Sequence, residues 1–351
     1  MQLGDGTTTG SSKPVLVKKA DGGILEDVKL MRSTYRHSCA VVQGGRVYCW
    51  GRNRSGQLGD GTTTRRLYAI ATKSSSDTNL SGVRQVVGGY RYSCALLQSK
   101  EVHCWGSNGL NIDRASFSGS GIDTSHCYDH VDPDSAADDW DYRPARFPGS
   151  LWCPRRDSHL VPRLGMLGDT GTNGKGPIPR PVAVRAVSGV GNLSNVHSIY
   201  SHSRHTCALL ESKQLVCWGD NEDGQLGDRS RASRGRPVFV QADSAGTTPL
   251  GNIEHVGMYM SNTCALSSDA KVYCWGSHTQ GRLGNGKNNG GNTRYAVPIR
   301  GVSGAREMNN TRLLGTMSNH SCLITKDNRI ACWGHGTATH RGDQAAPVLM
   351  F

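Results

Sequence analysis

The chain has 351 residues, twelve cysteines and a formal net charge of +12 at pH 7. Twelve cysteines, ten of them in regularly spaced pairs, are typical of an oxidising compartment. No apolar run is long enough to cross a membrane, and no signal peptide is visible. Because the chain opens in mid-repeat at 1–6, we expect that a leader has been removed or cut away. The Lys and Arg residues form no block, which disfavours nucleic acid as the partner.

A turn motif and an apolar segment open the chain. Leu3-Gly4-Asp5-Gly6 is the first of several Leu-Gly-Asp motifs. These motifs open no helix, so we interpret them as tight turns between repeated units and not as phosphate-binding loops. Pro14–Val17 is the first of six apolar segments marked by Pro or Ala, and a Pro at the start of a strand suits a sheet edge. The later segments are 68–70, 181–184, 237–240, 296–299 and 347–350.

The next element is a hairpin that occurs in five copies. In its first copy, apolar arms flank a polar tip centred on Gly44, and the second Cys follows the first by ten positions. A three-residue loop then makes the two cysteines cross-strand neighbours, near the separation that a disulfide needs. Zinc sites use closer pairs or convergent sets, so the spacing disfavours zinc. The predicted disulfides are Cys39–Cys49, Cys94–Cys104, Cys207–Cys217, Cys264–Cys274 and Cys322–Cys332.

Tryptophans set the repeat period. They stand at Trp50, Trp105, Trp218, Trp275 and Trp333, and the step from the second to the third is close to two periods. A further copy is therefore expected at 153–165, with Arg163 in place of the second Cys and Leu164 in place of Trp. Each period holds about four short antiparallel strands and no convincing helix, so the fold class is all-β, a β-propeller.

The run from His37 to Thr64 resembles the repeat of the regulator of chromosome condensation family, in its Cys-containing bacterial or extracellular form. The resemblance covers nearly the whole chain and is weak across 107–166. It implies a single propeller domain over 1–351, in which a blade takes its last strand from the next repeat. We expect six to seven blades. The strand at Pro14–Val17 is then left over, either in an incomplete blade or donated to a neighbouring molecule.

Residues 107–166 break the pattern and form a degenerate, irregular repeat with a long acidic loop. Its two cysteines lie outside the period, and we predict a Cys127–Cys153 disulfide. A solvated loop is the simpler interpretation of the acidic cluster, and calcium binding through hard oxygen ligands is the alternative. The candidate calcium ligands are Asp129, Asp132, Asp134, Asp138 and Asp139.

Other motifs are weaker. His37, His205 and His320 recur with the period, which indicates buried hydrogen-bonding roles and not catalysis. Arg341-Gly342-Asp343 resembles an integrin-binding triplet but falls where a Leu-Gly-Asp turn is expected. Possible glycosylation acceptors are Asn53, Asn79, Asn192, Asn309 and Asn319.

No nucleophile–base pair, metal triad or nucleotide fingerprint stands in the sequence, so we expect no enzyme and no cofactor. The preferred hypothesis is a secreted or cell-surface module for binding, adhesion or scaffolding, acting through loops on a ring face. Its partner is a protein, a glycan or its own copies. One alternative is a structural subunit of an extracellular fibre or surface layer, linked by strand exchange. Another, implied by the resemblance, is an intracellular guanine-nucleotide exchange factor or chromatin binder.

Overall fold

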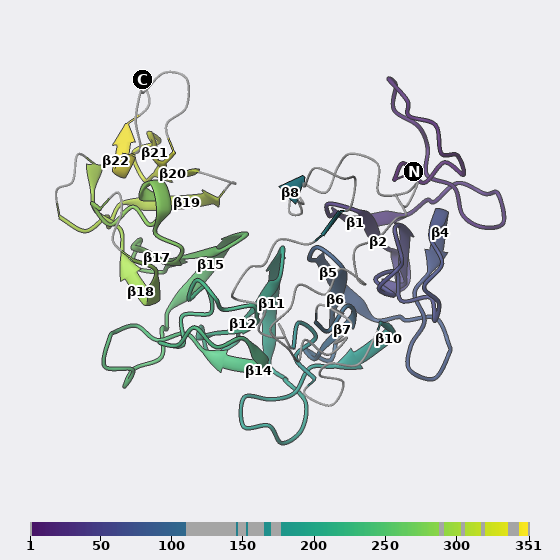
Figure 1. The fold of residues 1–351 in the computed structure, drawn as a ribbon, viewed down its shortest axis with the longest axis horizontal. Helices are drawn as coiled ribbons and strands as arrows, with labels where there is room; N and C mark the ends of the chain where they lie inside the picture. Colours follow the sequence, from purple (N-terminus) through teal and green to yellow (C-terminus); the bar gives the residue numbers. More distant parts are fainter. Residues whose placement is uncertain are drawn as a thin grey trace. The chain divides into compact units, whose positions relative to one another are not determined.

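The computed structural model describes residues 2–109, 145–146, 152–153, 165–169, 177–287, 291–302, 306–316, 320–335 and 344–349. The chain divides into two compact units, one made of 1–110 and 163–351, the other of 111–162. In the second unit the structure describes one antiparallel pair, β8 (Ala145–Arg146) with β9 (Trp152–Cys153). All the four-stranded sheets belong to the first unit (Figure 1).

Five four-stranded antiparallel sheets make up the described part of this unit, which confirms the all-β prediction. The first sheet consists of β1 (Val28–Ser33), β2 (His37–Val42), β3 (Val47–Gly51) and β4 (Arg66–Ala71). The second consists of β5 (Val83–Gly88), β6 (Tyr92–Leu97), β7 (Val102–Gly106) and β10 (Ile178–Ala183). The third consists of β11 (Val196–His202), β12 (His205–Leu210), β13 (Leu215–Gly219) and β14 (Arg234–Phe239). The fourth consists of β15 (Ile253–Tyr259), β16 (Asn262–Ser267), β17 (Val272–Gly276) and β18 (Thr293–Pro298). The fifth consists of β19 (Thr311–Thr316), β20 (His320–Thr325), β21 (Ile330–Gly334) and β22 (Gln344–Leu349). Two short 3-10 helices, η1 (Gln43–Gly45) and η4 (Thr279–Gly281), lie in connections.

Each sheet carries one disulfide across its second and third strands, as the Cys spacing predicts. Directly opposed residues such as Cys39 and Cys49 have Cα atoms 4.1 Å apart. The five bridges join the predicted pairs Cys39–Cys49, Cys94–Cys104, Cys207–Cys217, Cys264–Cys274 and Cys322–Cys332. In the chain-entropy model a loop this short gains roughly 3 kcal/mol per bridge.

In the sequence, the irregular stretch falls between β7 and β10, two strands that pair with each other in the second sheet. The turn Leu167-Gly168-Asp169, which follows the expected sixth hairpin in the sequence, belongs to this sheet. Asn108, just after β7, donates from Nδ2 to Asp169 Oδ1 at 3.0 Å, as Asn53 does to Asp60. The sixth hairpin itself, expected at 153–165, falls almost wholly outside the described residues and stays a prediction.

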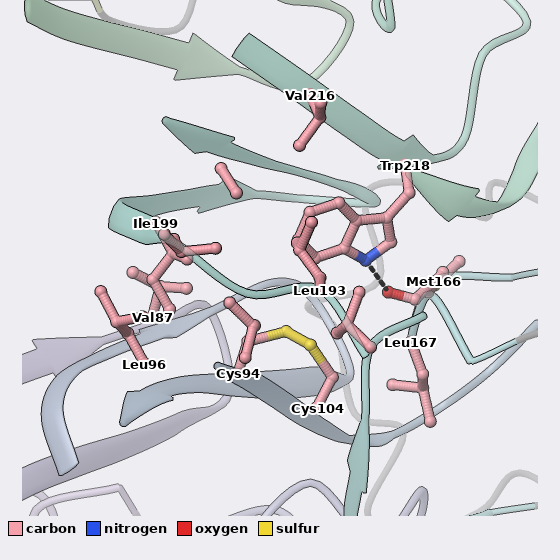
Figure 2. Close-up of a cluster of buried hydrophobic side chains, with 14 of the residues drawn as sticks. Val87, Cys94, Leu96, Cys104, Met166, Leu167, Leu193, Ile199, Val216 and Trp218 are labelled. Carbon is pink, nitrogen blue, oxygen red and sulfur yellow. Dashed lines mark hydrogen bonds between the residues drawn. A yellow bond between two sulfur atoms is a disulfide. The ribbon is translucent and has the colours of Figure 1, made fainter. Parts of the chain in front are cut away.

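The hydrophobic core lies between consecutive sheets. The first strands β1, β5, β11, β15 and β19 are neighbours in that order. Between the second and third sheets, the Cys94–Cys104 disulfide and Leu96 pack against Ile199 and the Trp218 ring (Figure 2). Such a core is divided into layers of similar composition, one at each junction.

Tryptophan fixes each junction. The Trp218 indole Nε1 donates to the Met166 carbonyl at 3.2 Å, just before the Leu-Gly-Asp turn of the preceding sheet (Figure 2). The equivalent donor–acceptor pairs are Trp50–Gln2, Trp105–Gln57, Trp275–Gln225 and Trp333–Arg282. The turn needs glycine: Gly227 has φ 69°, and a Cβ there would lie 2.9 Å from Trp275 Nε1. The turn interpretation of the Leu-Gly-Asp motif is therefore confirmed.

Residues 2–25 form no named strand but repeat the turn contacts found between consecutive sheets. The Gln2 carbonyl accepts from Trp50, and the Lys18 amide donates to the Gly4 carbonyl at 2.8 Å, as the Lys73 amide does to Gly59. Residues 11–16 stand at the sequence positions of a fourth strand relative to this hydrogen bond, and they form no strand. Among the described residues they pair with no third strand.

Within the described ranges, no helix has the length and apolar character needed to span a bilayer.

Candidate functional site: an aromatic–arginine row

The loops that join the first and second strands of successive sheets meet one another. Each loop is only two or three residues long, because the first and second strands of a sheet form a tight antiparallel pair. On these loops, and at the last residues of β11 and β15, lie the side chains that we call the aromatic–arginine row: Tyr35, Arg36, Tyr90, Arg91, His202 and Tyr259.

The first half of the row is a stacked cluster. Tyr35 and Tyr90 stack with ring centroids 5.4 Å apart and planes 22° apart. The Arg36 guanidinium carbon lies 5.3 Å from both centroids, and Arg36 Nη2 donates to Tyr90 Oη at 3.0 Å. Arg91 lies 5.4 Å from the Tyr90 centroid. Cation–π contacts and the hydrogen bond therefore preorganise two arginines over aromatic faces.

The second half extends the row across the third and fourth sheets. The Tyr90 amide donates to the Ser203 carbonyl at 2.7 Å, which ties the second loop to the third. The His202 and Tyr259 rings then lie 4.4 Å apart. Burial lowers the pKa of His202, so its ring is neutral at pH 7 and the arginines carry the charge of the row.

Buried hydrogen bonds under the row hold its loops. His37 contacts Thr34 Oγ1 through Nδ1 and Ser93 Oγ of the next sheet through Nε2, both at 2.8 Å. His205 Nε2 reaches Thr263 Oγ1 of its next sheet at 3.0 Å. Burial lowers the pKa of both imidazoles to about 3. The structural role that the period predicts is thus confirmed for His37 and His205.

Tyr92 takes the place of this histidine in the second sheet. Its hydroxyl donates to the His205 carbonyl at 2.8 Å and lies 2.9 Å from Thr206 Oγ1, so it also joins two sheets. Burial raises the pKa of Tyr92 to about 12, which keeps the hydroxyl protonated as a donor.

The surface of the row is suited to binding and offers no nucleophile–base pair. Tyr35 is 52% exposed, and Met260 beside Tyr259 is 42% exposed. The loops 34–36, 89–91, 202–204 and 260–261 contain no acidic residue. Planar guanidinium groups on aromatic supports recognise carboxylates through paired hydrogen bonds.

Sequence reasoning did not find this row. A tight loop has too few residues for a periodic pattern, and the four loops differ in sequence. The available signal was the Tyr-Arg dipeptide at 35–36 and again at 90–91, directly before a hairpin.

The possible glycosylation acceptors have different environments. Asn53 is wrong as a candidate, since it is fully buried and its Nδ2 donates to Asp60 Oδ1 and to the Thr62 and Thr64 carbonyls, each at 3.0 Å. An acceptor amide must be accessible. Asn79, Asn192 and Asn309 are exposed, and their use stays a prediction.

Several predicted features lie outside the described residues and stay predictions. These are the Cys127–Cys153 disulfide, the sequon at Asn319, the triplet Arg341-Gly342-Asp343, and the calcium candidates Asp129, Asp132, Asp134, Asp138 and Asp139. In the part of the chain that is described, no group of three or more His, Cys, Asp or Glu side chains is placed to hold a metal ion.

Comparison with known proteins identifies the repeat. The model of the Regulator of chromosome condensation (RCC1) repeat matches residues 31–57, 83–111 and 196–225. The ultraviolet-B receptor UVR8 of Arabidopsis thaliana is 25% identical over 309 residues, which cover 87% of this chain and 64% of the receptor. The E3 ubiquitin-protein ligase HERC2 of Mus musculus is 27% identical over 174 residues, 49% of this chain and 3% of the ligase. The crystal structure of human WBSCR16 superposes with a TM-score of 0.60 at 15% identity, covering 92% of this chain and 66% of that one, and shows the fold alone. This chain spans less than two thirds of each of these proteins.

Proposed function

Because the chain is a propeller built from regulator of chromosome condensation repeats, we propose that it is a non-catalytic module that binds an acidic protein surface. The observation that carries the proposal is the aromatic–arginine row, in which Arg36 and Arg91 are held over Tyr90 at a partly exposed loop surface. The net charge of +12 favours encounter with an acidic partner.

The composition of the row favours a protein over a glycan or nucleic acid. Tyr and Arg are the residues most enriched among binding hot spots, because each buries a large, rigid area and keeps a polar handle. Nucleic-acid binders add a continuous basic track along the phosphate backbone, whereas the two tyrosines and Met260 make this surface partly apolar. Glycan and nucleic-acid binding are therefore outcomes to be distinguished by experiment.

The proposed address is extracellular or at the cell surface. Five hairpin disulfides support it, since such bridges persist outside the reducing cytosol. If the protein were instead an intracellular exchange factor or chromatin binder, its cysteines should be free thiols in protein isolated without oxidation. Mass spectrometry of alkylated native protein distinguishes the two.

Binding of the full chain to an array of Asp- and Glu-rich peptides, to heparin and to duplex DNA tests the function. We expect the Tyr35→Ala/Arg36→Ala variant to lose peptide affinity about tenfold or more. The matched control is Arg46→Ala, which removes an exposed arginine at the opposite end of the same hairpin and should change little. Equal losses in both variants, or binding to heparin and DNA alone, would show that overall charge and not the row does the binding.

A further inference from the structure

The fourth sheet differs from the first three at its turn. In the first sheet Asn53, which follows β3, donates from Nδ2 to Asp60 of the turn at 3.0 Å, and the second and third sheets have the same pair. In the fourth sheet His278 takes the place of the asparagine and Asn285 that of the aspartate. His278 Nε2 lies 3.1 Å from Asn285 Oδ1, so the ring donates to the amide oxygen. This turn therefore contains an amide where the other three contain a carboxylate.

Asn285 is followed by a glycine, Gly286. Because glycine has no Cβ, its backbone nitrogen can approach the side-chain carbonyl carbon of a preceding asparagine closely. Gly286 is exposed and Asn285 is half-buried, so water reaches the pair. The dipeptide is therefore placed for an intramolecular reaction between the Gly286 nitrogen and the Asn285 amide.

Two donors polarise the Asn285 amide. Its Oδ1 accepts from His278 Nε2 at 3.1 Å and from the Lys287 amide at 3.2 Å. Both donors stabilise the negative charge that develops on this oxygen when a nucleophile attacks the carbonyl carbon. Within the described residues Asn285 Nδ2 donates no hydrogen bond, so the leaving nitrogen is not held in place.

The Gly286 amide is available as the nucleophile. At the same turn position in the third sheet, the Arg229 amide donates to the Arg294 carbonyl of the next sheet at 2.7 Å, and the first sheet has an equivalent bond. In the part of the chain that the structure describes, the Gly286 amide has no such acceptor. A Cβ at Gly286 would lie 3.8 Å from Arg300 Nε, so a positive charge stands close to this amide and favours loss of its proton.

We propose that Asn285 is a site of spontaneous deamidation in the folded protein. The Gly286 nitrogen forms a bond to Asn285 Cγ while the Cγ–Nδ2 bond breaks, and Nδ2 leaves as ammonia with the proton of the Gly286 amide. Water then opens the succinimide, its hydroxyl adding to Cγ and its hydrogen to the Gly286 nitrogen. The product is an aspartate at position 285, the residue type that the first three sheets already have in this turn. Opening at the backbone carbonyl instead gives isoaspartate.

A second Asn-Gly dipeptide, Asn108-Gly109, is the matched control because its amide is locked at both ends. Asn108 is 1% exposed, its Nδ2 donates to Asp169 Oδ1, and its Oδ1 accepts from the Leu167 amide, each at 3.0 Å. These bonds keep the carbonyl carbon from turning towards the Gly109 nitrogen. We therefore expect Asn108 to persist in the folded chain.

Peptide mapping of the full chain after incubation at mildly alkaline pH tests the proposal. Trypsin separates the two sites, since Asn285 lies in the peptide 283–287 and Asn108 in the peptide 101–114. In the folded chain Asn285 should deamidate at least about tenfold faster than Asn108. In urea the two rates should become similar, because the contacts that distinguish the sites are lost. Similar rates in the folded chain, or a difference that persists in urea, would overturn the proposal.

Substitution of His278 tests the donor. His278→Phe should slow deamidation of Asn285 about tenfold, and His278→Asn should restore the rate, because asparagine donates to the turn from this position in other sheets. Intact native disulfides by mass spectrometry show that each variant is folded. An unchanged rate in folded His278→Phe would overturn the role of the imidazole. If that variant does not fold, the comparison of the two sites in the unmodified chain still decides. These measurements use no binding partner and are independent of the aromatic–arginine row.

Discussion

The third–fourth and fourth–fifth junctions differ in the residue that begins the second strand of the earlier sheet, which is His205 in β12 and Asn262 in β16. At the third–fourth junction, His205 Nε2 contacts Thr263 Oγ1, which donates to the Gln225 carbonyl at 2.9 Å. That carbonyl also accepts from Trp275 at 2.8 Å, so three groups converge on one turn. Imidazole, hydroxyl and indole thereby connect two sheets in one network.

At the fourth–fifth junction, Asn262 stands where His205 does. Its shorter side chain donates to the Ser277 carbonyl of its own sheet at 2.6 Å, and a small polar cavity remains, lined by Asn262, Thr316, Ser321 and their neighbours. Trp333 still donates to the Arg282 carbonyl at 2.9 Å. The difference teaches that tryptophan docking defines a junction, and that the histidine link is a separate addition.

Removing the tryptophan should have the largest effect. Trp275→Ala and Trp333→Ala each delete a fully buried indole and a hydrogen bond, and each should lower the free energy of unfolding by about 3–5 kcal/mol. Urea denaturation measures the loss. A negligible loss for Trp333→Ala alone would mean that the fifth sheet is held by something other than its tryptophan.

Lowering the pH should have the second-largest effect, because it weakens the junctions that are linked by histidine. His37 and His205 have folded-state pKa values of about 3 against an ordinary value near 6.5, so the unfolded chain binds protons first as pH falls. Their stabilisation is complete above about pH 6.5 and is lost progressively towards pH 3, by up to roughly 1.4 kcal/mol per pH unit for each ring. Thermal unfolding from pH 7 to pH 4.5 measures it. The stability of the His205→Asn variant should depend less on pH than that of the unmodified chain. An unchanged pH dependence would contradict the role assigned to His205.

Exchanging the two side chains should have the smallest effect. His205→Asn removes the link to Thr263 and should cost about 1–2 kcal/mol. Asn262→His should fill the cavity beside Ser321 and add up to about 1 kcal/mol. Hydrogen exchange of β19 and β20 amides reports the second change locally. If Asn262→His instead destabilises the chain, the fourth–fifth junction is already packed to fit asparagine.

Much of the fold could be predicted because its signals are local. Ten-residue Cys spacing about Gly44 or Ser99 fixes the hairpin register, and register fixes the disulfide. The pairing of β10 with β7 could not be predicted in this way. A fourth strand carries no mark of which third strand it joins, and residues 107–177 separate β7 from β10 in the sequence.

The site was harder to predict than the fold. Asn53 reads as a surface sequon, yet in space its amide holds a turn together through Asp60 and Thr62. The row at Tyr35 and Tyr90 depends on loops brought together from separate sheets, and tertiary proximity leaves no periodic pattern in the chain.

The tryptophan contacts also set a direction for assembly. Each indole binds a carbonyl that lies 48 to 52 residues earlier in the chain, so its acceptor has always been synthesised first. A growing chain can therefore lay each new hairpin on a turn that already exists, adding one layer at a time from the amino end. The second sheet is the exception, because β10, which pairs with β7, is synthesised only after residues 107–177.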